Sequence, residues 1–357
     1  MYPVLNTCIV GFGMSGRIFH APFLLNNPGY NWASVVERNS NNAAAIKPGI
    51  KTFRSFDEAI NDSVIDLIII TTPNETHFPF AKKALLAGKH VVVEKPFTNT
   101  SAEAAELIEI ANKTNKILSV YQNRRYVADF LTIKEILAEK KLGDIVEFEG
   151  HFDRYRPQPK PNAWREEEKV GSGILYDLGS HLIDQALCLF SLPKFITADV
   201  RKQRPHARVD DYFDIRLDYD YTKVILKAGM LVREPGPRYI IHGTKGSFIK
   251  YGEDPQEASL KNGSIPSIEN WGKEPTANFG LIHTELNGEI IRQKVESKPG
   301  DFGMYYTNLY ETIAKNKPLK EKPEHGYNTI RLIELAIESN ERKCTLPCIN
   351  LISISYQ

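Results

Sequence analysis

The sequence lacks the features that mark secreted and membrane proteins. No basic segment precedes the first apolar run, which argues against a signal or transit peptide. No apolar run approaches the roughly 20 residues that a membrane-spanning helix needs. An excess of one charge is also missing, because 45 basic residues are balanced by 44 acidic ones, for a formal net charge of +1. The composition therefore predicts neither a nucleic-acid partner nor a membrane partner.

Cysteine is scarce as well. The chain of 357 residues contains four, namely Cys8, Cys188, Cys344 and Cys348. Without a secretory signal, this usage predicts reduced thiols and a cytoplasmic location. Cys344 and Cys348 lie close together near the C-terminus, but no second cysteine pair or nearby histidine completes a zinc site. We therefore expect no metal there.

The length of 357 residues is long for one core and predicts two domains, residues 1–123 and 124–357. In the first, short apolar runs alternate with segments of helical spacing, which indicates an α/β fold with a doubly wound parallel sheet. The expected strands are residues 8–11, 32–37, 65–71, 90–94 and 117–121. The expected helices are residues 18–25, 56–60, 77–87 and 102–113.

The second domain has a different pattern. Alternating apolar and polar residues predict a C-terminal α+β domain with a large, mostly antiparallel sheet. The expected strands lie in IVEFEGHFDRYRP, ADVRKQRP, DYFDIRLDYD, KVILKAGMLV and RYIIHG. The expected helices are residues 130–140, 174–190, 305–314 and 327–341. Residues 252–275, rich in Pro, Gly, Asn and charge, are expected to form a surface excursion.

A glycine pattern follows the first expected strand and opens a helix. It consists of Gly11, Phe12, Gly13, Met14, Ser15 and Gly16. The glycines permit a tight turn and close approach of backbone amides to a pyrophosphate. Alone the pattern is weak, but the next strand ends in an acid about 20 residues on, as the dinucleotide fingerprint requires. We interpret residues 1–123 as a Rossmann NAD(P)-binding domain.

The acid is Glu37, and Arg38 follows it. A carboxylate here accepts hydrogen bonds from the adenine-ribose hydroxyls and repels a 2′-phosphate, whereas an arginine attracts that phosphate or stacks on adenine. The two residues indicate different coenzymes. We favour NAD, with NADP or dual use next, and an inert surface ion pair is the alternative without function.

Two further clusters close parallel strands. In an open parallel sheet the ligand lies outside the carboxyl ends of the strands, so both clusters are expected to border the coenzyme. The residues expected there are Thr71, Thr72, Pro73, Asn74, His77, Glu94, Lys95 and Pro96. Pro96 can turn the chain sharply, and a cis peptide is one way to do so. For Lys95 the alternative is an ordinary surface lysine.

A third cluster lies in the second domain. If a helix begins near residue 174, then Asp177, His181 and Asp184 form one polar stripe on a largely apolar helix. Such a stripe faces water or a cavity, and a core histidine with its hydrogen bonds satisfied is an equally good interpretation. A zinc site of these three side chains lacks a further ligand.

Together these motifs resemble a known family. The turn GFGMSG, the EKP tripeptide and the segment DLGSHLID are similar to the glucose-fructose oxidoreductase and inositol dehydrogenase family, Gfo/Idh/MocA, over essentially the whole chain. Segments such as LSVYQNRR, HFDRYRP, WRE, DYFDIRLDY and SFIKYGEDPQE resemble in particular the scyllo-inositol 2-dehydrogenase subgroup. The Glu37–Arg38 pair departs from NADP-using relatives, which often have small residues before the arginine, so coenzyme choice stays open.

The resemblance implies NAD(P)-dependent oxidation of a secondary hydroxyl on a cyclic polyol or sugar. Lys95 matches the family's EKP lysine, and Asp177 with His181 match its D-x-x-x-H pair. Histidine titrates in the range a base needs, a carboxylate can orient it, and a lysine can stabilise alkoxide charge. Whether Lys95 or His181 is the immediate base is left open.

Other residues are expected to serve substrate or coenzyme. Asn123, Arg124 and Tyr126 follow the last strand of the first domain and are expected to bind substrate, as are Tyr155 and Asp184. Ordinary hinge residues are the alternative for the first three. From the family's Trp-Arg pair we carry over Trp164 and Arg165 as coenzyme-binding residues.

Two other functions are alternatives to a polyol or sugar dehydrogenase. A non-catalytic nucleotide-binding sensor would not need Lys95, Asp177 and His181 together, and a dehydrogenase of a non-sugar ketone or dihydrodiol would need a more apolar pocket. The resemblance also implies a homodimer or homotetramer.

Overall fold

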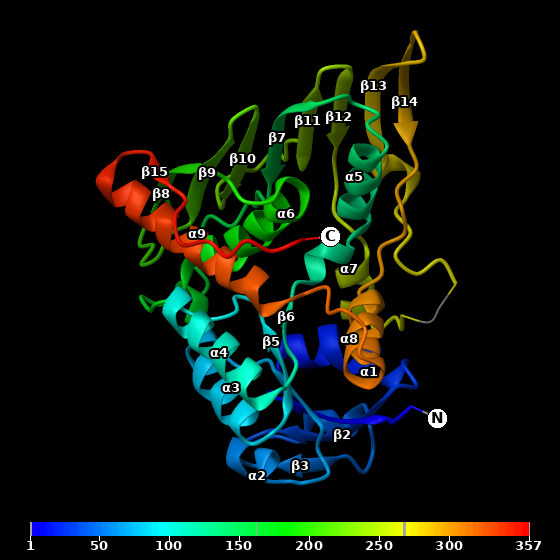
Figure 1. Cartoon of the computed structure of the whole chain (residues 1–357), viewed down its shortest axis with the longest axis vertical. Coiled ribbons are helices and arrows are strands. Elements are labelled where there is room, and N and C mark those ends of the chain that lie inside the picture. Colours follow the sequence, from blue (N-terminus) through cyan, green and yellow to red (C-terminus); the bar gives the residue numbers. More distant parts are fainter. Residues whose placement is uncertain (1, 162, 267–268, 357) are drawn as a thin grey trace. The chain divides into compact units, whose positions relative to one another are not determined.

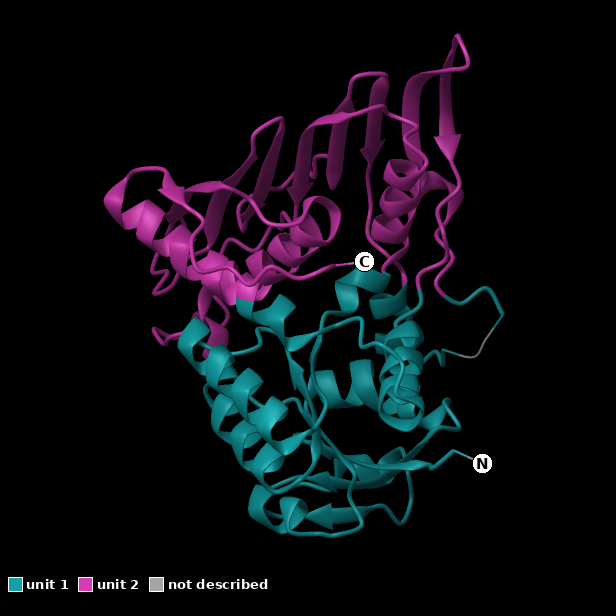
Figure 2. Ribbon diagram, viewed as in Figure 1, with its two compact units in different colours: residues 1–126, 256–271, 301–327 teal, residues 127–255, 272–300, 328–357 magenta. Residues whose placement is uncertain are grey.

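The computed structural model describes residues 2–161, 163–266 and 269–356. The chain folds into two compact units (Figure 2). Unit 1 consists of residues 1–126, 256–271 and 301–327, and unit 2 of residues 127–255, 272–300 and 328–357. The first crossing lies beside the boundary that the sequence predicts after residue 123. The two later returns to unit 1 have no counterpart in that prediction.

The strands of unit 1 form one parallel sheet. They are β1 (Leu5–Val10), β2 (Tyr30–Val36), β3 (Lys51–Phe53), β4 (Leu67–Ile70), β5 (His90–Glu94) and β6 (Leu118–Tyr121). The order is β3-β2-β1-β4-β5-β6, and every pair is parallel. The chain therefore winds in opposite directions from β1 and β4, and the carboxyl ends of these two strands flank the switch point where such sheets bind nucleotides. This confirms the Rossmann prediction, although β3 was not expected.

Helices cover both faces of this sheet, with α3 and α4 on one and α1 and α8 on the other (Figure 1). The helices are α1 (Ala21–Leu25), α2 (Phe56–Ile60), α3 (His77–Leu86), α4 (Ser101–Thr114), α7 (Gln256–Lys261) and α8 (Gly303–Lys315). Short turns are a π-helix, η1 (Gly16–His20), and 3-10 helices η2 (Asn42–Ala45), η3 (Asn74–Thr76) and η4 (Asn123–Tyr126). Helix α4 begins with a capping box in which Thr100 and Glu103 satisfy each other's backbone N–H groups.

The segment expected as a surface excursion is instead partly buried in unit 1. It contains α7, where Gln256 has no exposed surface and its side-chain N–H donates to the Tyr126 carbonyl at 3.1 Å. Trp271 packs edge-on against Phe23 of α1, with ring centroids 6.5 Å apart. Proline and glycine content correctly indicated turns here but could not reveal these contacts.

The strands of unit 2 form a second, mixed sheet. They are β7 (Ile145–His151), β8 (Phe195–Arg201), β9 (Tyr212–Tyr219), β10 (Thr222–Gly229), β11 (Tyr239–Gly243), β12 (Gly246–Lys250), β13 (Gly280–Leu286), β14 (Glu289–Val295) and β15 (Leu346–Pro347). The order is β14-β13-β12-β11-β7-β10-β9-β8-β15, with β7 and β10 parallel and the other pairs antiparallel. The mostly antiparallel prediction is confirmed.

Helices lie along one face of this sheet (Figure 1). They are α5 (Ala128–Ala138), α6 (Ser180–Phe190) and α9 (Pro323–Arg342), whose residues 328–342 belong to unit 2. Short turns are η5 (Trp164–Glu166), η6 (Leu175–Gly179) and η7 (Thr276–Asn278). The side chains under the helices, such as Phe148, Val224, Ile241 and Phe248, are fully buried. Their sequence neighbours point to the opposite face and remain half-exposed or exposed.

Candidate coenzyme and catalytic site

The glycine turn after β1 has the geometry of a phosphate cradle. Gly11 has a φ of +89°, a conformation that residues with a Cβ rarely adopt. A Cβ on Gly16 would lie 2.6 Å from the Gly11 carbonyl oxygen, so only glycine allows the turn to close. A Cβ on Gly13 would meet nothing within 4 Å, so the fold itself does not require glycine there. Close approach of a pyrophosphate does require it, and the turn therefore fits a dinucleotide.

The other residues of the turn differ in their surroundings. Phe12 is buried and stacks on Trp32, with ring centroids 5.3 Å apart, so its side chain belongs to the core. Met14 is exposed, and the Ser15 hydroxyl donates to the Glu94 carboxylate at the end of β5. Ser15 therefore links the turn to a second strand end.

The end of β4 is tied to the same turn. The Thr71 hydroxyl donates to the Gly11 carbonyl at 2.6 Å, while Pro73 is exposed and Asn74 is buried. The sequence predicts His77 at the coenzyme, but its ring is only 1% exposed. The ring lies 2.8 Å from the Pro96 carbonyl (Nδ1) and 2.9 Å from the Thr72 carbonyl (Nε2). His77 thus joins the ends of β4 and β5 from inside unit 1.

The lysine of the EKP tripeptide lies where a buried strand ends. Val91, Val92 and Val93 of β5 have no exposed surface, whereas Lys95 is half-buried. The peptide between Lys95 and Pro96 is cis. The backbone N–H of Lys95 donates to Glu94 Oε2 at 3.1 Å. The end of β5 therefore presents an amine next to the switch-point strand β4, which pairs with β5.

Glu37 makes contacts that the sequence does not reveal. Its carboxylate is 4% exposed and accepts hydrogen bonds from the Ser40 hydroxyl at 2.7 Å and from the Asn42 and Ala43 N–H groups at 3.0 Å each. It thereby caps η2. The preference for NAD assumes that the Glu37 carboxylate is available to bind the ribose. In the structure this carboxylate already accepts hydrogen bonds within unit 1. Arg38, in contrast, is exposed.

In unit 2, the polar stripe falls across a change of helix type. Asp177 lies in the π-helical turn η6, and His181 and Asp184 lie in α6. His181 is 5% exposed and Asp184 2%, whereas Asp177 is half-buried. The stripe is therefore buried at His181 and Asp184 and only partly covered at Asp177. π-Helical turns often occur at functional sites.

Arg165 and Asp177 lie together in unit 2. Arg165 Nε is 3.5 Å from Asp177 Oδ1, and the guanidinium carbon lies 4.3 Å from the centre of the Trp164 ring. Stacking on tryptophan and pairing with a carboxylate together restrict the guanidinium.

A buried arginine that the sequence gave no reason to select holds this loop. Arg204 is 5% exposed and donates to Asp211 at 2.9 Å and to Glu166 at 2.7 Å. Glu166 directly follows Arg165, so Arg204 anchors the turn that carries Trp164 and Arg165. No motif marks Arg204, because Asp211 is seven residues away and Glu166 is 38 residues away, at no recognisable spacing.

The residues predicted to bind substrate have partners of their own. Arg124 forms an ion pair with Glu257 of α7, and the Tyr126 hydroxyl donates to Glu321 at 2.5 Å. Asn123 is 6% exposed. The Tyr126 hydroxyl is thereby occupied inside unit 1. In unit 2, Tyr155 is 40% exposed, and the guanidinium carbon of Arg233 lies 4.0 Å from the centre of its ring.

Two absences hold for the described part of the chain. Within residues 2–161, 163–266 and 269–356, no three His, Cys, Asp or Glu side chains are grouped to hold a metal ion. No helix in these same ranges is long and apolar enough to span a bilayer.

Both parts of the chain match models of one family. Residues 5–122 match the NAD-binding Rossmann fold of an oxidoreductase family, and residues 134–347 match that family's C-terminal alpha/beta domain. With the glycine turn at the switch point of the sheet, this defines the chain as a nucleotide-binding oxidoreductase. It belongs to the Gfo/Idh/MocA family.

Individual relatives cover almost the full length. The uncharacterized oxidoreductase YdgJ of Escherichia coli (strain K12) is 41% identical over 95% of this chain and 97% of its own. The scyllo-inositol 2-dehydrogenase (NADP(+)) IolW of Bacillus subtilis (strain 168) is 40% identical over 95% and 94%. The solved structure of yvaA from Bacillus subtilis superposes with a TM-score of 0.94 at 39% identity, covering 97% of this chain and 99% of that one.

Proposed function

We propose that the protein oxidises, reversibly, a secondary hydroxyl of a cyclic polyol or sugar with NADP as its coenzyme. The observation that carries this proposal is the glycine turn at the switch point of the sheet, with Lys95 at the end of β5. Similarity to a relative named as an inositol dehydrogenase supports the substrate class.

In this proposal the chain's own residues move the proton. Lys95 stabilises the negative charge that develops on the substrate oxygen. His181 takes up or passes on the hydroxyl proton, and Asp177 orients the imidazole or stabilises its cation. The coenzyme, when bound, supplies the hydride acceptor. Lys95 and His181 both remain candidates for the immediate base.

The preference for NADP rests on Glu37 and Arg38. The Glu37 carboxylate already accepts three hydrogen bonds from its own turn, so little acceptor capacity remains for a ribose diol. The exposed Arg38 can pair with a 2′-phosphate. The name of IolW specifies NADP(+), which agrees with this proposal.

The two other functions predict different behaviour. A nucleotide-binding sensor would bind coenzyme without turnover, and a dehydrogenase of a non-sugar ketone or dihydrodiol would prefer apolar substrates. The side chains proposed for the chemistry are ionisable, which favours polyols and sugars over apolar ketones. A cytoplasmic location is part of the proposal, because a chain with four cysteines among 357 residues suits a reducing compartment.

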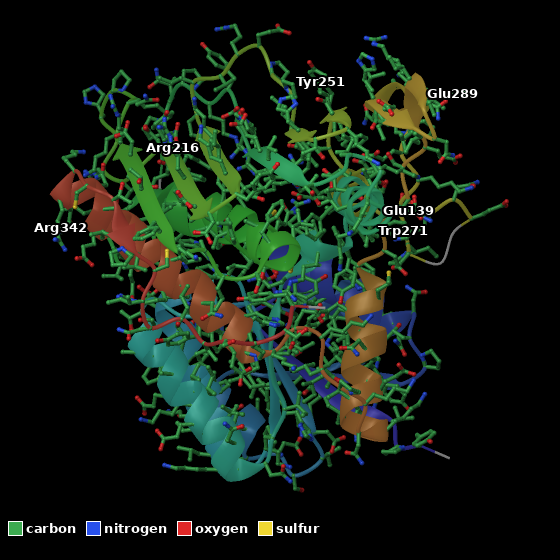
Figure 3. All side chains as sticks on the ribbon, turned by 45° about the horizontal axis from the view of Figure 1, so that its top comes forward. Glu139, Arg216, Tyr251, Trp271, Glu289 and Arg342 are labelled. Atoms are coloured by element: carbon green, nitrogen blue, oxygen red, sulfur yellow. The ribbon has the colours of Figure 1, made fainter. Side chains whose placement is uncertain are left out.

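Self-association is proposed for the helix-free face of the sheet in unit 2. Consecutive strand partners on that face form a row of half-exposed and exposed side chains, namely Arg216, Ile225, Glu149, Ile240, Ile249 and Leu281. Arg216 lies on β9 at one end of it (Figure 3). An apolar centre with charged neighbours suits a homo-oligomer interface. Ile249→Glu should lower the mass measured by analytical ultracentrifugation, and an unchanged mass above that of the monomer would exclude this face.

The test of function is a substrate panel. Inositol isomers, pyranose sugars, and non-sugar secondary alcohols and dihydrodiols are each offered with NAD⁺ and NADP⁺, and the absorbance of the reduced coenzyme is followed. The proposal predicts turnover with at least one polyol or sugar and faster turnover with NADP⁺. Tight coenzyme binding without turnover of any substrate would favour the sensor, and turnover of the non-sugar substrates alone would favour the second alternative.

A further inference from the structure

A buried network lies behind the glycine turn of unit 1. Its centre is Glu94, the glutamate of the EKP tripeptide, whose carboxylate accepts from three donors. Oε1 accepts from the Ser15 hydroxyl and from His20 Nε2 at 3.0 Å, and Oε2 accepts from the backbone N–H of Lys95 at 3.1 Å. One carboxylate therefore contacts both the coenzyme turn and the lysine proposed for catalysis.

His20 connects this carboxylate to helix α8. The His20 ring has no exposed surface, and its Nδ1 lies 2.5 Å from the Tyr306 hydroxyl. Burial raises the pKa of Tyr306 well above its usual range, so its hydroxyl keeps the proton that it can donate to an unprotonated Nδ1. Nε2–H then donates to Glu94. The hydrogen bond from Tyr306 thus selects the tautomer in which His20 supports the carboxylate.

These donors also keep Glu94 ionised. Burial alone would raise the pKa of Glu94, but the hydrogen bonds from His20 and Ser15 and the charge of Lys95 hold that pKa below its usual value. A carboxylate that only accepts matches all three contacts, whereas a protonated one would lose an acceptor.

The network includes a residue from the segment in which the chain returns to unit 1. Tyr306 comes from residues 301–327, and the other members come from β5 and the segment after β1. Without α8 the His20 ring would lose the partner that sets its tautomer. Glu94 contacts Ser15 and Lys95, the two members of the network that lie in the proposed site. A purely structural role would not need these two contacts.

We propose that Glu94 and His20 are positioning residues, set by Tyr306, that couple the coenzyme-binding turn to the placement of Lys95. The part of this inference that concerns Lys95 rests on the proposed function. The effect of the network on the glycine turn can be measured as coenzyme binding, without any turnover. The chain offers a matched control in the adjacent Tyr305. Its hydroxyl donates to Ser119 at 2.9 Å, and both tyrosines are fully buried in α8.

The experiment compares Tyr306→Phe with Tyr305→Phe. Each variant removes one buried hydroxyl, so a structural role predicts equal changes in both. Coupling predicts that Tyr306→Phe alone weakens NADPH binding, by about threefold or more in a fluorescence titration, and lowers kcat by about tenfold. It also predicts that the acid limb of the kcat/KM profile moves to higher pH, because Glu94 loses support for its charge. Tyr305→Phe should keep the wild-type affinity, kcat and profile.

A second variant guards against loss of fold. Ser15→Ala removes one donor at the half-buried end of the network and should weaken NADPH binding in the same direction. The inference would be overturned if the two tyrosine variants had equal NADPH affinities and equal pH profiles while Ser15→Ala bound NADPH as tightly as the wild type. If no substrate is turned over, the proposed function fails, and the NADPH titrations still decide whether the network acts on the turn.

Discussion

Arg165 Nε lies 3.5 Å from Asp177 Oδ1, and the same guanidinium stacks on the neighbouring Trp164 ring. The contact joins a residue expected at the coenzyme to one expected in catalysis. It places a positive charge against the carboxylate that is proposed to orient His181. The pair is one restraint on where the Asp177 carboxylate points.

Arg165→Gln is expected to impair turnover more than stability. The Arg165 side chain is 46% exposed, so the ion pair contributes at most about 1 kcal/mol to folding. Loss of a group that orients the catalytic carboxylate should lower kcat/KM by about tenfold or more. Steady-state kinetics and thermal unfolding measure the two effects. Arg201→Gln is the control, because Arg201 pairs with Asp199 on an exposed part of β8. Equal kinetics in both variants would contradict the role of Arg165.

Arg38→Gln is expected to change coenzyme selectivity. Losing an arginine that pairs with the 2′-phosphate should weaken NADP⁺ binding by about ten- to a hundredfold. The affinity for NAD⁺, which lacks that phosphate, should stay within about twofold. Isothermal titration with both coenzymes measures the change, with the exposed Lys113→Gln on α4 as control. If NADP⁺ and NAD⁺ were weakened equally, Arg38 would not discriminate between them.

His90 is expected to make unit 1 less stable in acid. Its Nδ1 accepts from the Ile117 N–H at 3.0 Å, which requires an unprotonated nitrogen, and burial lowers its pKa to about 4. The unfolded chain protonates near the ordinary value of about 6.5. Stability is therefore complete above that value and falls as pH drops toward 4, by up to about 3 kcal/mol.

The check is the pH dependence of thermal unfolding in wild type and His90→Gln. The variant should show a smaller loss of melting temperature between pH 6.5 and 4 than the wild type. His283→Gln, at an exposed position on β13, should follow the wild-type curve. Parallel curves for wild type and His90→Gln would contradict the assignment.

The fold could be predicted where the pattern reports burial directly. The apolar run of β5 is covered on both faces, and its predicted bounds match the observed ones. Strands β12, β13 and β14 were missed because turn-forming and charged residues interrupt their apolar alternation. The return of residues 301–327 to unit 1 depends on contacts such as Tyr126 with Glu321, whose partners are 195 residues apart.

The candidate site could be predicted in composition but not in geometry. Glycine spacing and strand ends correctly identified a nucleotide-binding fold. The orientation of Glu37 is decided by the three donors of the turn that follows it, which no spacing rule reveals. His77 and Glu94 are predicted to border the coenzyme, and their contacts could not be read from spacing: His77 joins the ends of β4 and β5, and Glu94 accepts from Ser15 of the glycine turn.

The central claim is that Lys95 serves the chemical step rather than coenzyme binding. The most direct measurement is the single-turnover rate of NADP⁺ reduction by wild type and Lys95→Met, with the substrate found in the panel and both ligands saturating. Lys82→Met, at a half-exposed position on α3, is the control. The account predicts a loss of about a hundredfold or more in Lys95→Met with NADP⁺ affinity within about threefold of wild type. A wild-type rate in Lys95→Met would contradict it.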